Sequence, residues 1–127
     1  MDNKFIPADI ERFINETIDS VAQLEALLLF RRNPEERWNI RDLADRLYIS
    51  EKQTTELVIQ LCAAGLVTQR EPARYQYQPN STELKRKIDQ LAELYAKHLV
   101  PITNLIHSKP KTRVREFADA FKFRKDD

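Results

Sequence analysis

The sequence predicts a mainly α-helical protein with one small β-hairpin. Apolar residues recur at spacings of three and four along most of the chain, whereas strand-like alternation occurs in one short region. The 127 residues include one glycine. Because the turns of sheet-rich folds usually need residues with positive φ, a single glycine favours helices. Hydrophobic residues make up 42% of the chain and charged residues 32%, so it can bury a core and keep a polar surface.

Two helices are expected at the N-terminal end. Pro7 is suited to the start of a helix, and the apolar residues after it keep helical spacing: Ile10, Phe13, Ile14 and Ile18. Ser20 can cap a second helix, which should end at Asn33 because Pro34 disfavours helical backbone at the residue before it. The inward side chains of this helix are expected to be Val21, Leu24, Leu27, Leu28 and Phe30.

Residues 37–40, RWNI, are expected to be short and extended, with Trp38 and Ile40 on one face. A helix should follow. Asp42 would lie in its first turn, where the helix dipole favours an acidic side chain. One face of this helix is apolar: Leu43, Ala44 and Leu47.

A further helix is predicted over residues 51–64, after a tight turn. Ser50 and Gln53 match the S-x-x-Q capping box, which indicates a helix start at Glu51. Gly65 is placed to stop this helix. Its inward face should consist of Thr54, Leu57, Val58 and Leu61.

The predicted hairpin covers residues 66–70 and 74–78. Both stretches have the content of strands, and Tyr75 and Tyr77 alternate with glutamines. The three residues between the stretches, Glu-Pro-Ala, would form the loop.

A long helix is predicted over residues 81–107, with Ser81 as its N-cap. Pro101 should kink it near Val100. The apolar residues of this helix alternate in steps of four and three, which is the a/d pattern of a coiled coil. This seam predicts that two copies of the chain pair as a homodimer through Leu84, Ile88, Leu91, Tyr95, His98, Ile102 and Leu105.

A short amphipathic helix is predicted at about residues 111–124. It could pack on the body as a last core helix, lie in a groove of a protein partner, or contact phosphates or an anionic membrane. As a docking segment it would present an aromatic set to the partner: Val114, Phe117, Phe121 and Phe123.

The order helix, helix, short strand, helix, turn, helix, strand, loop, strand resembles the winged helix-turn-helix superfamily of DNA-binding regulators. The resemblance is carried by IRDLADRLYIS (residues 40–50) followed by EKQTTELVIQLCAAGLV (residues 51–67), and it covers about residues 20–80. A flanking long helix that pairs two subunits is a frequent addition in that family. The resemblance therefore implies a winged helix-turn-helix domain over residues 1–80 and a C-terminal helical extension over residues 81–127.

The resemblance also implies a double-stranded DNA partner and a role in transcription regulation. The helix over residues 51–64 would be the recognition helix, and residues 70–75 would form the wing. Base edges would meet Lys52, Gln53, Thr55 and Glu56, whereas phosphates would meet Arg41, Ser50, Arg70 and Arg74.

The total charge does not by itself attract nucleic acid, because 21 Lys and Arg stand against 20 Asp and Glu. Any attraction must be local, and Glu51, Glu56 and Glu71 partly cancel the basic residues near the expected interface. The alternative function is a winged-helix module for protein contacts that uses the recognition-helix face and the C-terminal aromatic helix. Ile59 would then lie outward in the contact surface, unless it is buried against the long helix.

The sequence gives no support to an enzyme, a cofactor or a metal site. There is no glycine-rich phosphate loop, and Cys62 lies among apolar neighbours, where a thiol is usually inert. His98 and His107 are expected on opposite helix faces. No apolar run approaches the ~20 residues of a membrane span, and no signal segment is apparent. Because one cysteine fits a reducing compartment, the expected location is the cytoplasm.

Overall fold

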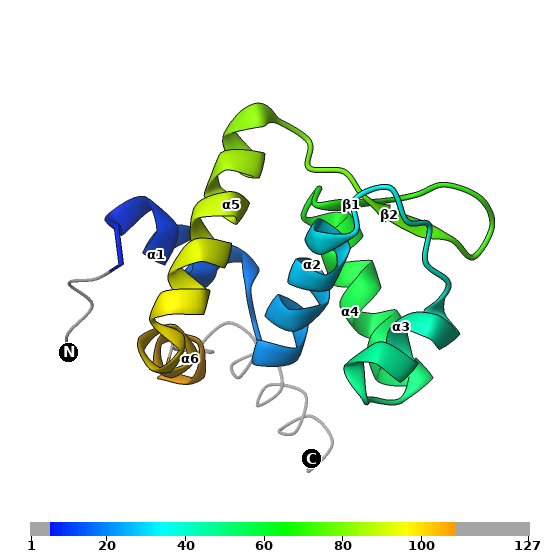
Figure 1. Cartoon of the computed structure of the whole chain (residues 1–127), viewed down its shortest axis with the longest axis horizontal. Coiled ribbons are helices and arrows are strands. Elements are labelled where there is room, and N and C mark those ends of the chain that lie inside the picture. Colours follow the sequence, from blue (N-terminus) through cyan, green and yellow to red (C-terminus); the bar gives the residue numbers. More distant parts are fainter. Residues whose placement is uncertain (1–5, 109–127) are drawn as a thin grey trace, which may run out of the picture.

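A computed structural model of the chain describes residues 6–108. Within that part, the protein has six helices and one two-stranded antiparallel sheet, which confirms the mainly helical prediction with a small hairpin. The predicted segment at about residues 111–124, with Val114, Phe117, Phe121 and Phe123, lies outside the described residues. The elements, shown in Figure 1, are α1 (Ala8–Thr17), α2 (Val21–Arg32), α3 (Ile40–Leu47), α4 (Glu51–Ala63), β1 (Val67–Gln69), β2 (Tyr75–Tyr77), α5 (Thr82–Lys97) and α6 (Leu99–Ser108).

Helix α2 joins the two sides of the molecule. On one side of it lie α1, α5 and α6, and on the other lie α3, α4 and the hairpin (Figure 1). It contacts α3, α4, β2 and α6, and most of its side chains are buried. One continuous cluster of buried apolar side chains includes residues from both sides of residue 80, so the expected domain boundary there does not separate two cores.

Local capping interactions fix the helix starts that the sequence indicates. The hydroxyl oxygens of Ser20, Ser50 and Ser81 each accept a hydrogen bond from the backbone N–H three residues later, at 3.0, 3.0 and 3.1 Å. A cap of this kind typically stabilises a helix by about 1 kcal/mol. Gly65 ends α4 with a φ of 79°, and a Cβ at this position would lie 2.2 Å from Nδ2 of Asn80.

The prediction for residues 37–40 is half wrong. Trp38 is extended and buried, and its backbone forms an antiparallel bridge with Tyr75 through two hydrogen bonds of 2.8 Å. Ile40, however, is the first residue of α3. The cause is Asn39, whose Oδ1 accepts a 2.7 Å bond from the N–H of Asp42 and so caps the helix.

The long helix expected over residues 81–107 is two helices that meet at His98, whose φ of −132° and ψ of 57° are not helical. The kink expected near Val100 is therefore a break two residues earlier. Pro101 explains the position, because a proline ring clashes with the carbonyl four residues before it and cannot donate to it. That carbonyl belongs to Lys97, which is the last residue of α5.

The heptad seam packs inside a single chain. Its central side chains are almost fully buried there, and Leu84 and His98 are half-buried. Helix α5 contacts α1, and α6 contacts α2. Steps of three and four place apolar residues on one helix face whether the partner helix belongs to the same chain or to another. The assignment of this seam to a subunit interface is corrected accordingly: Ile88, Leu91, Tyr95, Ile102 and Leu105 are core residues of one chain.

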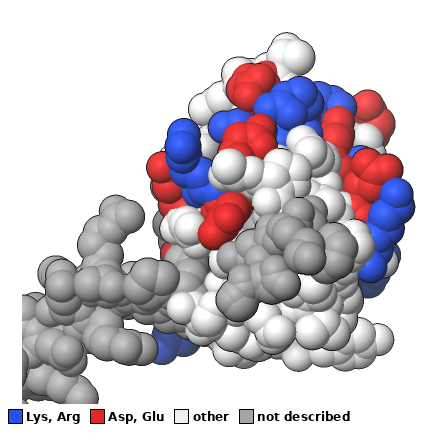
Figure 2. Space-filling view, turned by 90° about the vertical axis from the view of Figure 1, so that its left-hand side faces the viewer, with Lys and Arg blue, Asp and Glu red and all other residues white. Residues whose placement is uncertain are grey.

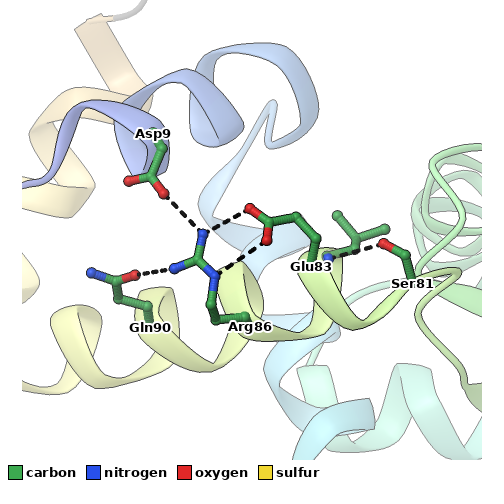
Figure 3. Close-up of polar contacts among 6 residues, drawn as sticks. Asp9, Ser81, Glu83, Arg86 and Gln90 are labelled. Carbon is green, nitrogen blue, oxygen red and sulfur yellow. Dashed lines mark hydrogen bonds and ion pairs between the residues drawn. The ribbon is translucent and has the colours of Figure 1, made fainter.

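Polar contacts also join α1 to α5 at the surface (Figure 3). Nη2 of Arg86 donates to Oδ2 of Asp9 at 3.1 Å and to Oε2 of Glu83 at 2.8 Å, and its Nη1 donates to Oε1 of Gln90 at 3.1 Å. Hydrogen bonding to the Arg86 guanidinium holds the pKa of Asp9 below its ordinary value of 3.8 and the pKa of Glu83 below 4.5. The pairing therefore favours the folded state when these carboxylates are ionised.

Replacing Arg86 with glutamine should lower the free energy of unfolding at neutral pH but not in acid. Because the folded-state pKa values are lowered, the contribution is fully present above pH 4.5 and is lost as the pH falls below 3.8. Urea unfolding of the wild type and Arg86→Gln from neutral to acidic pH measures it. Lys97→Gln is the control, since Nζ of Lys97 lies 3.7 Å from Glu93 on the same helix. A stability difference that is the same at all pH values would contradict this account.

Candidate nucleic-acid interface

A tight turn sets the angle between α3 and α4. Tyr48 adopts a left-handed backbone with a φ of 61°, and 92% of its side chain is exposed. Thr54 is a polar residue at a fully buried position of α4, and its hydroxyl donates a 2.8 Å bond to the carbonyl of Ser50. That bond satisfies the hydroxyl, so a polar side chain fits between the two helices.

The outer face of α4 is a mixed polar and apolar stripe. The predicted inward residues Thr54, Leu57, Val58 and Leu61 are all buried. The residues Lys52, Thr55, Glu56 and Ile59 are exposed, and their spacing of three, one and three places them on one helix face. Ile59 is 61% exposed and so is not buried against the C-terminal helices.

The capping box limits what two predicted contact residues can offer. Oε1 of Gln53 accepts 3.2 Å bonds from both the N–H and the hydroxyl of Ser50. The hydroxyl oxygen of Ser50 in turn accepts from the N–H of Gln53. The carbonyl end of the Gln53 amide is therefore committed to the helix start, which leaves its Nε2 end for an external acceptor.

The hairpin presents basic side chains on one of its faces. Strand pairing sets Thr68 opposite Gln76 and Gln69 opposite Tyr75. Because side chains alternate between the faces of a sheet, Arg70 and Arg74 share the face of Gln76, away from the half-buried Tyr75. Nε and Nη2 of Arg70 donate 2.8 Å hydrogen bonds to the side-chain carbonyls of Gln76 and Gln78. These two bonds hold the guanidinium alongside β2.

Arg37 was not among the residues expected at the interface from the sequence. The bridge between Trp38 and Tyr75 makes residues 37 and 38 a third extended segment beside β2, so Arg37 lies on the face of Arg74. Nη1 of Arg74 donates a 3.1 Å bond to the carbonyl of Arg37, and Nη1 of Arg37 lies 3.0 Å from Oε2 of Glu71. The pattern around Trp38 indicated an extended segment, but only the pairing with Tyr75 places it beside the hairpin.

Comparison with known proteins bears on the fold. No protein-family model and no curated protein matches the chain. Among solved structures, the chain is similar to the crystal structure of RV1404 from Mycobacterium tuberculosis, with a TM-score of 0.52 and 17% sequence identity. The match covers 94% of this chain and 82% of that chain. At this level of identity, the likeness concerns the shared arrangement of helices and hairpin.

On the side of the molecule formed by α1, α5 and α6, the charged residues that the structure describes are of both signs (Figure 2). Figure 2 shows acidic and basic side chains intermingled over the upper part of that side and an uncharged area lower down. The uncharged area agrees with the sequence of α6, LVPITNLIHS, which has no acidic residue, lysine or arginine. The grouped arginines of the hairpin and the exposed stripe of α4 therefore form the candidate interface, with Arg41 exposed in the first turn of α3.

Residues 6–108 give little indication of a metal site or a reactive thiol. Across this part of the chain, no three His, Cys, Asp or Glu side chains are grouped so that they could hold a metal ion. Burial raises the pKa of the Cys62 thiol, which keeps it protonated and weakly nucleophilic. None of the helices described is long and apolar enough to cross a bilayer.

Proposed function

We propose that this protein is a winged-helix transcription regulator that binds double-stranded DNA. In this proposal α4 enters the major groove and the hairpin is the wing on the phosphate backbone. The observation that carries the proposal is the grouping of Arg37, Arg70 and Arg74 on one hairpin face. Guanidinium groups fit phosphate oxygens in a bidentate geometry, so such a group favours a backbone contact.

The outer face of α4 supplies chemistry that suits base edges. Lys52 can donate to the O6 and N7 of guanine, and Glu56 can accept from the N4 amino group of cytosine. Thr55 donates its hydroxyl hydrogen to the carbonyl of Glu51 at 2.9 Å, so its oxygen remains an acceptor. Ile59 offers an apolar contact for the methyl group of thymine. The exposed N-terminus of α4 at Ser50 would face a phosphate.

A homodimer remains part of the proposal, through a surface other than the heptad seam. Leu99 and Val100 are 53% and 60% exposed at the junction of α5 and α6. In this proposal two subunits meet there, and each contributes one α4 helix to a half-site of the duplex. Sedimentation at the mass of a single chain would remove this part of the proposal and leave monomeric binding.

A protein-interaction module is the second candidate function, and the exposure of Ile59 favours it. An apolar side chain in the centre of an exposed helix face is a common feature of protein contacts. Glu51 and Glu56 are exposed on the same helix, N-terminal to Ile59, and acidic residues would suit a basic partner better than DNA. This candidate predicts an α4 surface that binds a peptide or protein and gains nothing from the arginines of the hairpin.

Selection from a randomised duplex library tests sequence-specific recognition by α4. Wild type should enrich a defined motif, and Lys52→Ala should relax the preference at one guanine position and weaken binding to that motif by about 1 to 3 kcal/mol. Lys97→Ala, an exposed lysine on α5, is the matched control and should enrich the wild-type motif. Failure of the wild type to enrich any motif would contradict sequence-specific regulation.

A further inference from the structure

One ion pair joins the loop of the hairpin to the segment before α3. Nη1 of Arg37 lies 3.0 Å from Oε2 of Glu71, and the two side chains are 50% and 56% exposed. Water reaches both groups, so the pair is weak compared with a buried one. A phosphate oxygen presents the same kind of acceptor to a guanidinium as a carboxylate does, and it can compete for Arg37.

The backbone of Arg37 is held in place independently of this ion pair. The carbonyl of Arg37 accepts from Nη1 of Arg74, and the neighbouring Trp38 bonds twice to Tyr75. In addition, Nε2 of Gln76 donates a 2.9 Å bond to the carbonyl of Pro34. Loss of the Glu71 contact would therefore free the guanidinium of Arg37 without displacing its Cα from the hairpin.

We propose that Glu71 is an internal phosphate mimic. Its carboxylate pairs with the guanidinium of Arg37 in the free protein, and a DNA phosphate replaces it as the partner of Arg37 on binding. This inference rests on the proposed function and adds Arg37 to the backbone contacts. The exchange reduces affinity because binding must first break the Arg37–Glu71 pair. Glu71 would thus limit non-specific binding by the hairpin.

A double-mutant cycle on DNA affinity tests the exchange. With a duplex of mixed sequence as the probe, Glu71→Gln should tighten binding by about 3- to 10-fold, on the order of one additional free cation. Arg37→Ala should reduce the slope of log affinity against log salt by about 0.9. In the Arg37→Ala background, Glu71→Gln should give a gain of less than about 2-fold, because the arginine that it would release is missing.

The matched control is Glu35→Gln, which removes an exposed carboxylate from the segment before α3 that also contains Arg37. If Glu71 acted only as a negative charge, Glu35→Gln would tighten binding equally, and Glu71→Gln would keep its full gain without Arg37. Either result overturns the exchange. Weaker DNA binding by the Glu71→Gln variant than by the wild type would also overturn the exchange and would show that the ion pair positions Arg37 for binding. Circular dichroism and thermal unfolding check that each variant is folded.

The two proposals fail in different ways. If the wild type and Glu71→Gln both fail to bind the duplex at low salt, the proposed function is wrong, and this inference falls with it. If the wild type binds and the two substitutions are additive, the proposed function stands and the exchange between Glu71 and phosphate is wrong.

Discussion

Replacing Arg70 and Arg74 together with alanine is expected to weaken DNA binding about 10- to 100-fold near physiological salt. Both guanidinium groups lie on the exposed face of the hairpin, and neither has a carboxylate among its hydrogen-bond partners there. Each lost phosphate contact should reduce the slope of log affinity against log salt by about 0.9, which gives almost two units for the pair. Fluorescence anisotropy of a labelled duplex over a salt series measures both quantities.

The control for this variant must lose the same charge elsewhere. Arg12 on α1 and Lys97 on α5 are exposed, so Arg12→Ala/Lys97→Ala changes the net charge equally, away from the hairpin. Because Arg70 also bonds to Gln76 and Gln78, circular dichroism should establish that the hairpin variant remains folded. Equal weakening in both double variants would mean that net charge, and not the hairpin, governs binding.

Leu91→Ala is expected to lower the free energy of unfolding by about 2 to 5 kcal/mol, the usual range for truncating a buried leucine. Leu91 is fully buried in the face of α5 that packs inside the chain. The loss should be the same at low and high protein concentration, because the cavity forms within one subunit. Urea unfolding at two protein concentrations measures it.

The oligomeric mass shows whether the heptad seam packs within one chain or between two subunits. Leu91→Ala should sediment with the same mass as the wild type. Ile59→Ala is the control, because that side chain is 61% exposed on α4 and its truncation should cost little stability. A Leu91→Ala protein that stays folded but halves its mass would restore the seam to the subunit interface.

Features that depend on neighbouring residues could be predicted from the sequence. The caps at Ser20, Ser50 and Ser81 and the stop at Gly65 each involve residues a few positions apart, so the residue types alone indicate them. The buried face of α4 follows from apolar spacing in the same way. In each case the interaction that decides the structure lies within the stretch of sequence that shows the pattern.

Features that depend on distant residues could not be predicted in full. The a/d spacing showed that one face of α5 and α6 is buried, but it could not show that α1 and α2 of the same chain cover it. Pro101 signalled an interruption, but its steric effect falls on the carbonyl of Lys97, and the helix ends there. Arg37 joins the hairpin only through the pairing of Trp38 with Tyr75. The covering of the α5 and α6 face and the place of Arg37 are set by tertiary contacts, whereas the end of α5 is a local effect of Pro101.

The candidate interface was predicted in outline through the resemblance to winged helix-turn-helix regulators. The outward positions of Lys52, Thr55 and Glu56 agree with that expectation. In the structure, the side-chain carbonyl of Gln53 accepts a hydrogen bond within the capping box, which leaves the Nε2 group of this side chain for DNA. The structure also places Arg37, paired with the carboxylate of Glu71, at the candidate interface. DNA contact itself stays a prediction.

Binding of double-stranded DNA by the hairpin and α4 is measured in one titration. Wild-type protein is added to a labelled duplex of mixed sequence, about 30 base pairs long, from about 50 mM to about 200 mM salt. We expect a saturable rise in anisotropy at low salt, with log affinity falling linearly as log salt increases. No rise in anisotropy even at the lowest salt would contradict it.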